Sequence, residues 1–364
     1  MDLTEKAAET LIALHECEGI GWLTMNKLVK LEGFENAAEW RAGDWRDRGL
    51  TPRQAAAAAA CLKPEAVEAS RKARERAGIS AVTIFDPRYP PLLRESVLPP
   101  WVLYYMGDLR LAAKTCVSVV GTRTATAYGR RVAEDWAAAW SSAGLAVVSG
   151  LARGIDAAAH VGALQGPGGT IAVLAGPLDT PYPPENRGLF RRIVERGLAL
   201  SEMPLGVQLR RGLFGLRNRI IAGMSAATVI VEAGEGSGAL ITAAKAAEAS
   251  REVYVVPGPV TSPRSIGALR LLGDGGRALV APDDLFRDAH YARHRAGADS
   301  APQPRQPLLP EERRVYDLLL DSPRSIDELL AASGMTFGLL HSVLLSLQIK
   351  RLITQQPGSV YTVL

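Results

Sequence analysis

The chain has 364 residues, of which 47% are hydrophobic and 22% are charged. This composition is typical of a soluble globular protein, and the length predicts two or three domains. The formal net charge is only +4. The overall charge therefore does not indicate a nucleic-acid-binding protein, and any electrostatic interaction with a partner has to be local.

The three cysteines, Cys17, Cys61 and Cys116, lie far apart and form no C-x-x-C pair. This spacing predicts reduced thiols, with neither a disulfide framework nor a zinc site. The N-terminus lacks the basic start, apolar run and cleavage site of a signal peptide. No apolar run approaches the roughly 20 residues that span a bilayer. We therefore predict a cytoplasmic protein with no metal and no membrane contact.

Residues 1–78 form the first predicted domain, with helices over residues 3–16, 22–32 and 51–78. Gly19 and Gly21 permit a tight turn between the first two helices. A helix-glycine-helix turn can present backbone N–H groups to a DNA phosphate, or it can be only a compact connector. We favour the connector, because few basic residues follow the turn.

Residues 79–286 form the second predicted domain, in which short β-branched runs alternate with helical segments. This alternation predicts an α/β fold with a doubly wound parallel sheet. The near-continuous apolar strands fit a sheet that is buried on both faces. The predicted strands cover residues 81–85, 117–120, 145–149, 170–175, 198–202, 227–233, 252–256 and 278–280.

Residues 287–308 lose this periodicity and are rich in Pro, Ala and Arg, which predicts a linker. Residues 309–364 then give three helices, the second of which has the capping-box spacing at Ser325 and Glu328. A hairpin with its turn at Pro357 and Gly358 follows. Three helices and a hairpin in so short a segment indicate a winged helix-turn-helix.

Several predicted strands are followed directly by a glycine turn and a helix. Ligands of open α/β sheets bind at the carboxyl ends of the strands, and glycine before a helix N-terminus allows backbone N–H groups to approach an anion. No segment matches G-x-G-x-x-G or G-x-x-x-x-G-K-[ST], so neither a dinucleotide cofactor nor P-loop ATP hydrolysis is indicated. We predict instead a phosphate-binding rim that contains Gly121, Thr122, Arg123, Ser149, Gly150, Arg153, Gly236, Ser237 and Gly238.

Residues 209–223, LRRGLFGLRNRIIAG, gather four arginines, and the nearest acids are Glu202 and Glu232. If a helix begins near Arg217, its first turn contains Arg217, Asn218 and Arg219. Cations there oppose the helix dipole by about 0.3–1 kcal/mol each at exposed sites, so a bound phosphate explains them better, because guanidinium groups donate to phosphate in pairs.

Less specific interpretations stay open for the same segment. Arg217 and Arg219 can pair with distant carboxylates and rigidify the core. Arg210 and Arg211 can be solvated surface residues. Phe214 is a core residue on base rates, or it stacks on a nucleic-acid base, an interaction worth roughly 1–3 kcal/mol.

The segments that carry these features resemble the DNA-processing protein DprA (Smf) family, in the right order over about residues 84–286. They are DPRYPPLLRESVLPPWVLYYMGD, VVGTRTATAYGRR, VVSGLARGIDAAAH, GGTIAVLAGPLDTPYP, RNRIIAG, VIVEAGEGSGALITA and REVYVVPG. The resemblance implies a Rossmann-like domain flanked by an N-terminal helical SAM-like domain and a C-terminal winged-helix domain. It further implies a homodimer that binds single-stranded DNA without sequence specificity, protects it, and helps load the RecA recombinase in natural transformation or recombination. It implies no cofactor and no catalytic residue.

Carried over by motif, the resemblance makes Arg123 the arginine of the GTR loop and Arg153 the basic residue of SGLARGID. The stacking aromatic residue falls at Phe214, with Arg210 and Arg211 beside it. The chain also departs from the family pattern. Gly215 stands where the family often has proline, and Leu269 and Gly276 replace an asparagine and an alanine in a region that family dimers use.

Two other functions compete with this interpretation. Enzymes on a similar fold hydrolyse nucleotide N-glycosidic bonds, but Ile241 stands where their catalytic glutamate is expected, which removes the obvious acid or base. Asp156 and His160 imitate a catalytic pair, although dipole compensation and a satisfied histidine explain them better. A sequence-specific repressor is disfavoured, because residues 336–350 contain one basic residue, Lys350, at the far end. We interpret the winged helix as a packing or partner-binding module.

Overall fold

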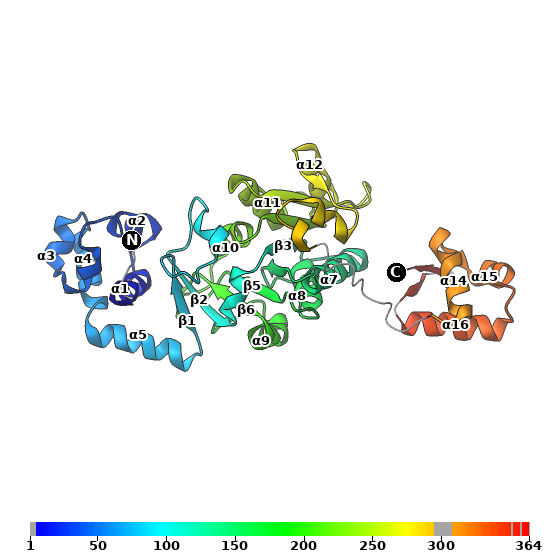
Figure 1. The fold of residues 1–364 in the computed structure, drawn as a ribbon, viewed down its shortest axis with the longest axis horizontal. Helices are drawn as coiled ribbons and strands as arrows, with labels where there is room; N and C mark the ends of the chain where they lie inside the picture. The colour runs from blue at the N-terminus through cyan, green and yellow to red at the C-terminus, as the bar shows by residue number, and fades with distance from the viewer. Residues whose placement is uncertain (1–4, 295–307, 351, 357–358, 364) are drawn as a thin grey trace. The chain divides into compact units, whose positions relative to one another are not determined.

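The computed structural model describes residues 5–294, 308–350, 352–356 and 359–363. The chain divides into two compact units, residues 1–299 and 300–364 (Figure 1). The sequence predicted that residues 1–78 form a domain of their own. The structure instead places them in one unit with the sheet that follows, because the helices and the sheet share a hydrophobic core.

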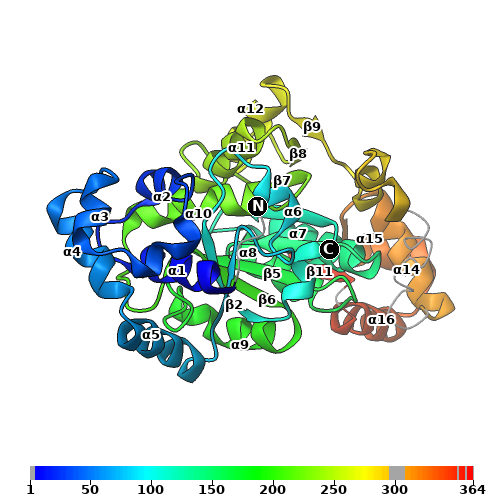
Figure 2. The same cartoon turned by 60° about the vertical axis from the view of Figure 1, so that its left-hand side comes forward.

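The N-terminal helices contain more breaks than the sequence suggested. The predicted helix over 51–78 is interrupted after Cys61 and restarts at Pro64, because proline cannot donate the hydrogen bond that a continuous helix needs there. Leu11 and Leu14 of the first helix pack in the same core as Val102 and Tyr104 of the sheet, so this helix lies against it (Figure 2). The elements are α1 (Glu5–Glu16), α2 (Trp22–Leu28), η1 (Phe34–Glu39), α3 (Ala42–Asp47), α4 (Pro52–Cys61) and α5 (Pro64–Arg76).

The first unit is built on a nine-stranded sheet with the order β1-β2-β6-β5-β4-β3-β7-β8-β9. The seven strands from β6 to β9 in this order are parallel, as predicted, while β2 pairs antiparallel with β1 and β6. The sequence prediction missed β2. The strands are β1 (Ser80–Thr83), β2 (Val102–Gly107), β3 (Cys116–Gly121), β4 (Ala146–Ser149), β5 (Thr170–Leu174), β6 (Leu198–Ser201), β7 (Ala227–Val231), β8 (Glu252–Val256) and β9 (Arg277–Ala278).

Helices cover both faces of this sheet, because successive strand residues point to opposite sides. Val117 and Val119 of β3 pack with α7 (Ala127–Ser142) and α8 (Ile155–Ala163). Val120 packs on the opposite face with α10 and α11. The remaining elements of these layers are α6 (Pro91–Arg94), η2 (Leu109–Ala113), η3 (Pro184–Asn186), α9 (Arg187–Arg196), α10 (Arg211–Gly223), α11 (Gly238–Glu248) and α12 (Ile266–Gly273).

The first unit extends further along the chain than predicted. After η4 (Pro282–Arg287), Tyr291 is fully buried and its hydroxyl donates a 2.8 Å hydrogen bond to the Cys116 carbonyl of β3. The segment then ends in η5 (Ala292–His294). The linker therefore does not begin at residue 287, and residues 295–307 lie outside the part of the chain that the structure describes.

The second unit has the winged-helix architecture that the sequence predicted. Three strands, β10 (Arg324–Ser325), β12 (Val360–Val363) and β11 (Ile353–Gln356), form a small sheet in this order, beside α14 (Pro310–Asp321), α15 (Ile326–Ser333) and α16 (Phe337–Ile349). The predicted capping box is confirmed, since Ser325 and Glu328 each bond the other's backbone. The predicted turn at Pro357 and Gly358 lies outside the described residues.

No single helix among the described residues has both the length and the apolarity that crossing a bilayer requires. The bent pair α15 and α16, with an angle of 113° between the helices, meets them only when the two are taken together.

Candidate nucleic-acid interface

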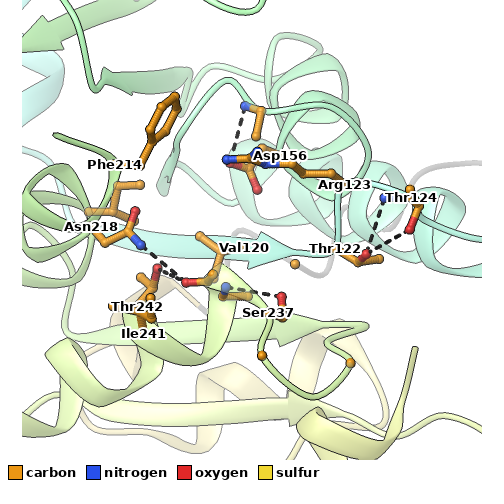
Figure 3. A pocket seen from close by; sticks show the side chains of 18 of the residues that line it. Val120, Thr122, Arg123, Thr124, Asp156, Phe214, Asn218, Ser237, Ile241 and Thr242 are labelled. Carbon is orange, nitrogen blue, oxygen red and sulfur yellow. Dashed lines mark hydrogen bonds between the residues drawn. The ribbon is translucent and has the colours of Figure 1, made fainter. Parts of the chain in front are cut away.

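A pocket of about 770 Å³ opens at the carboxyl ends of β3 and β7. These strands lie where the strand order reverses, with β4, β5 and β6 on one side and β8 and β9 on the other. Ligands of open α/β sheets bind at this position. Figure 3 shows that side chains from the loop after β3, from α10 and from the start of α11 surround one hollow.

The loop after β3 can approach the pocket closely only because of two glycines. A Cβ at Gly121 would lie 1.9 Å from the Val231 carbonyl oxygen, and Gly154 has a φ of 76° with Thr122 directly opposite. Glu232 fixes the far end of this loop, since its carboxylate accepts hydrogen bonds from the backbone N–H and hydroxyl of Thr126, the N-cap of α7. The loop therefore holds Thr122 and Arg123 at the pocket wall.

The first half of α10 supplies the exposed basic and aromatic side chains. The helix begins at Arg211 with Arg210 as its N-cap, six residues before the predicted start. Phe214 therefore lies on a helix rather than in a loop. The guanidinium carbon of Arg123 is 5.3 Å from the centre of the Phe214 ring, within the range of a cation–π contact. Arg210 and Arg211 are exposed and make no hydrogen bond or ion pair within the described chain.

The second half of α10 is buried. Arg217 is 7% exposed, and one guanidinium nitrogen donates 2.6 Å hydrogen bonds to the carbonyls of Gly150 and Val173. A Cβ at Gly150 would lie 2.0 Å from this guanidinium. Burial lowers the pKa of Arg217 to about 10, with Arg123 adding to the effect and Asp156 opposing it. Arg217 thus places a positive charge in the floor of the pocket.

Asn218 and Arg219 also have partners inside the chain. The Asn218 amide donates to the Gly238 carbonyl at 3.3 Å and its oxygen accepts from Arg217. Arg219 donates to both carboxylate oxygens of Glu202, at 2.5 and 2.7 Å. For Arg219 this is the alternative in which it pairs with a distant carboxylate. The placement of these residues in a first helical turn was wrong, because α10 begins at Arg211. Burial raises the pKa of Glu202, while Arg219 opposes this change.

Asp156 and His160 of α8 have structural roles. The Asp156 carboxylate accepts hydrogen bonds from the backbone N–H groups of Gly150 and Ala152, and burial raises its pKa. His160 is fully buried between the Leu151 N–H and the Thr170 hydroxyl, and burial lowers its pKa to about 3, with a further contribution from Arg217. A neutral, satisfied histidine is what the sequence analysis favoured over a catalytic pair.

The loop after β4 divides into a buried part and an exposed part. Ser149 has no exposed surface and its hydroxyl donates to the Val119 carbonyl at 2.6 Å. Gly150 is buried beneath Arg217. Both residues were predicted to contact the ligand. Ser149 lies below the pocket surface, whereas Gly150 contributes to the lining of the smaller pocket beside Phe214. Arg153 is 57% exposed and pairs with Glu185.

The start of α11 closes the other side of the pocket. Ser237 is the N-cap and accepts a hydrogen bond from the Ala239 N–H. Gly236 and Gly238 flank it, and a Cβ at either one would have no atom within 4 Å. Ile241 also lines the pocket and is 48% exposed. An apolar side chain therefore occupies the place where the competing glycosidic-bond hydrolysis would need a carboxylate.

A smaller pocket of about 110 Å³ adjoins the first on the other side of Phe214. Tyr182 forms its outer wall and meets the Phe214 ring edge-on, with ring centres 5.9 Å apart. Sequence reasoning missed Tyr182 and the exposed Arg264 of the large pocket. Tyr182 follows β5 in a glycine-containing loop, so the rule that loops after strands carry ligand residues was the signal available for it.

Comparisons with known proteins assign the chain to a family. Residues 80–290 match the family model of DNA recombination-mediator protein A. The chain belongs to this family, DprA/Smf. Protein Smf from Synechocystis is 36% identical over 76% of this chain and 78% of its own length. The X-ray structure of DNA processing protein A from Streptococcus pneumoniae covers 79% of this chain and 99% of its own, with 31% identity and a TM-score of 0.68.

A second solved structure of the DprA/Smf family is of a relative described as binding single-stranded DNA. DNA processing protein A from Helicobacter pylori, described for its single-stranded DNA binding mode, covers 57% of this chain and 94% of its own, with 27% identity and a TM-score of 0.53.

Among the described residues of the present chain, no three His, Cys, Asp or Glu side chains converge as metal ligands.

The C-terminal unit also matches the family. Residues 299–359 fit the model of the DprA winged helix domain. Lys350, the basic residue noted at the end of its third helix, is bound to the buried carboxylate of Glu312 at 2.5 and 2.7 Å. Phe337, Leu345 and Ile349 of α16 are more than half exposed. Within the described residues, α16 thus presents apolar side chains and no unpaired lysine or arginine.

Proposed function

We propose that this protein binds single-stranded DNA in the pocket at the carboxyl ends of β3 and β7. The observation that carries the proposal is the contact between Arg123 and Phe214 at the pocket wall. An aromatic ring that stacks on a base, next to a guanidinium that binds phosphate, is the arrangement that sequence-independent single-strand binding uses. The single-strand binding described for the Helicobacter pylori relative supports the same assignment.

One part of the pocket is charged and suits the phosphate of a nucleotide, and another part is apolar and suits the base. Arg123, Arg211 and Arg264 lie on its rim, and the N-terminus of α11 at Gly238 adds the positive end of a helix dipole, which favours an anion. The Phe214 and Tyr182 rings offer apolar surface to a base. Neither part reads the hydrogen-bonding edge of one particular base, so we expect binding without sequence specificity.

The wider role that we propose is that of a mediator, not an enzyme. It protects single-stranded DNA and helps load the RecA recombinase, during natural transformation or recombination, as a cytoplasmic homodimer. Ile241 at the position of the missing glutamate supports this choice over glycosidic-bond hydrolysis. The winged helix takes part through protein contacts, because the unpaired side chains that α16 exposes are mainly apolar.

Fluorescence anisotropy with a labelled oligonucleotide, first single-stranded and then duplex, tests the proposal. We expect the wild type to prefer the single strand. Arg123→Ala and Phe214→Ala should each weaken binding, the latter by about 1–3 kcal/mol. Arg110→Ala is the matched control, since Arg110 is 90% exposed and precedes β3, at the opposite edge of the sheet. Equal binding by all four proteins would assign the arginines to structure alone.

Two further assays separate the competing functions, one tests assembly, and one tests RecA loading. Release of free base from a nucleotide would favour the glycosidic-bond enzyme, and preference for one duplex sequence would favour a repressor. We expect neither result. Sedimentation at several protein concentrations measures the dimer, and the rate of RecA filament formation on single-stranded DNA, with and without this protein, measures loading.

A further inference from the structure

The helix α9 carries a row of arginines that the pocket does not use. The side chains of Arg187, Arg191 and Arg192 are exposed and make no hydrogen bond or ion pair within the described residues. Arg196, at the end of the same helix, donates to the Leu164 carbonyl at 3.1 Å. The exposed acid of this helix is Glu195.

The orientation of α9 is fixed by its apolar side. Phe190 and Ile193 are buried against the sheet, with Leu189 and Val194 partly buried beside them. Helical spacing therefore turns Arg187, Arg191 and Arg192 toward solvent. Arg187 and Arg191 are one turn apart, where like charges repel each other. This row destabilises the free helix slightly, and an external anion would remove the repulsion.

The N-terminal end of α9 adjoins the smaller pocket. Asn186, its N-cap, donates a 2.8 Å hydrogen bond to the Leu151 carbonyl in the loop after β4. Arg153 of the same loop lines the smaller pocket and pairs with Glu185, two residues before α9. Tyr182 forms the wall on this side. The arginine row thus starts where the smaller pocket ends.

From there the helix leads away from the proposed binding pocket. Figures 1 and 2 both show α9 along β5 and β6, and it contacts both strands. Because α9 connects β5 to β6, which are parallel, it runs from the carboxyl ends of the strands back to their amino ends. The helix of ten residues is about 15 Å long, and the row from Arg187 to Arg192 covers about 7.5 Å of it.

We propose that the outer face of α9 is a second binding segment for single-stranded DNA, which leaves the pocket past Tyr182 and Arg153 and continues along Arg187, Arg191 and Arg192. This inference rests on the proposed function of the pocket. The segment binds the sugar-phosphate backbone only, because no aromatic side chain is exposed on α9. It lengthens the DNA site without adding base preference.

Two oligonucleotides of different length test this segment, one of about 6 nucleotides to fill the pocket and one of about 20 to reach α9. In the variant Arg187→Ala/Arg191→Ala, we expect the short strand to bind as it does to the wild type. The long strand should bind about tenfold more weakly at low salt, and the slope of log K against log salt should fall by about 1.4, for two phosphates.

Two variants control for net charge and for side-chain identity. Arg71→Ala/Arg76→Ala removes two exposed arginines from α5 of the same unit, and it should leave both affinities unchanged. Arg187→Lys/Arg191→Lys should restore most of the long-strand binding, since lysine also neutralises phosphate. Circular dichroism confirms that each variant is folded.

The outcomes separate the two proposals. Unchanged affinity and slope for the long strand in Arg187→Ala/Arg191→Ala would overturn the α9 segment and leave the pocket intact. Equal loss for the short and long strands would also overturn it, since α9 would then act through the pocket. A wild type that binds neither strand would overturn the proposed function, and the α9 segment with it.

Discussion

The two halves of α10 contain the same basic residue type and use it in opposite ways. In the first half, Arg211 is exposed beside Phe214 and has no partner in the described chain. In the second half, Arg217 is buried on two carbonyls and Arg219 is paired with Glu202. One helix therefore serves as a ligand-facing surface at its start and as a core support at its end. Burial and available acceptors, not local sequence, decide which role an arginine has.

Among the substitutions that test the difference between the two halves of α10, Arg217→Ala is expected to have the largest effect. Removing the guanidinium leaves the buried carbonyls of Gly150 and Val173 unpaired and deprives Asp156 of its nearby cation. We expect the free energy of unfolding to fall by about 3–5 kcal/mol. Urea unfolding followed by circular dichroism measures it. Arg211→Ala serves as the control and should change stability by less than about 0.5 kcal/mol.

The buried residues near Arg217 of α10, among them His160 of α8, should also make the free energy of unfolding depend on pH. Burial lowers the pKa of His160 from its ordinary value of 6.5 to about 3 in the folded protein, so at pH 5 the unfolded chain binds a proton that the folded chain does not. Stability therefore decreases as pH falls through this window, by about 2 kcal/mol between pH 7 and pH 5. The pKa of the partly buried His15 shifts in the same direction, to about 4.

The comparison of wild type with His160→Gln isolates this contribution. Glutamine can accept the Leu151 N–H bond but does not titrate, so the variant should lose less stability on acidification. Unfolding midpoints at pH 7 and pH 5 give the difference. An identical decrease in both proteins would contradict the burial of a neutral His160.

The exposed half is tested by two substitutions of Phe214 that differ in ring character. Phe214→Trp keeps a stacking surface, and Phe214→Leu keeps only apolar bulk. We expect the tryptophan variant to retain single-strand affinity and the leucine variant to lose about 1 kcal/mol, roughly fivefold. Thermal unfolding should be similar for both, because Phe214 is only partly buried. Equal affinities would mean that the ring contributes packing and not stacking.

The smallest effect is expected from Arg211→Ala. One phosphate contact on a single strand contributes about 0.7 to the slope of log K against log salt. We expect the slope to fall by about this amount, with little change in affinity at high salt. A salt titration of oligonucleotide binding measures it. The exposed Arg110→Ala should leave the slope unchanged.

The position of the site could be predicted from sequence, but which of its residues are buried, and on what partners, could not. Glycine turns after apolar strands located Gly121, Arg123 and Ser237 at one sheet edge, since parallel strands end together. The partners of Arg217 are backbone carbonyls, which no side-chain pattern marks. Glu202, the partner of Arg219, is 17 residues away. Gly212 and Gly215 are weak helix formers, which hid the true start of α10.

The fold, too, could be predicted only in part from the sequence. Alternating β and α segments predicted the parallel strands, whereas β2 was missed because its antiparallel place is set by tertiary pairing with β6. The break before α5 could have been predicted from Pro64. The SAM-like character of the N-terminal helices stays a prediction. Nothing local indicated that these helices share a core with the sheet.

The anchoring of α10 has a consequence for the timing of DNA release. Arg217 and Asn218 tie the helix to the loops beneath it, one helical turn from Phe214. The ring therefore needs little ordering when a base arrives, and the entropy lost on binding is small. Substitutions at Phe214 should then act mainly on the dissociation rate, since the rate of encounter is set by the charges around the ring.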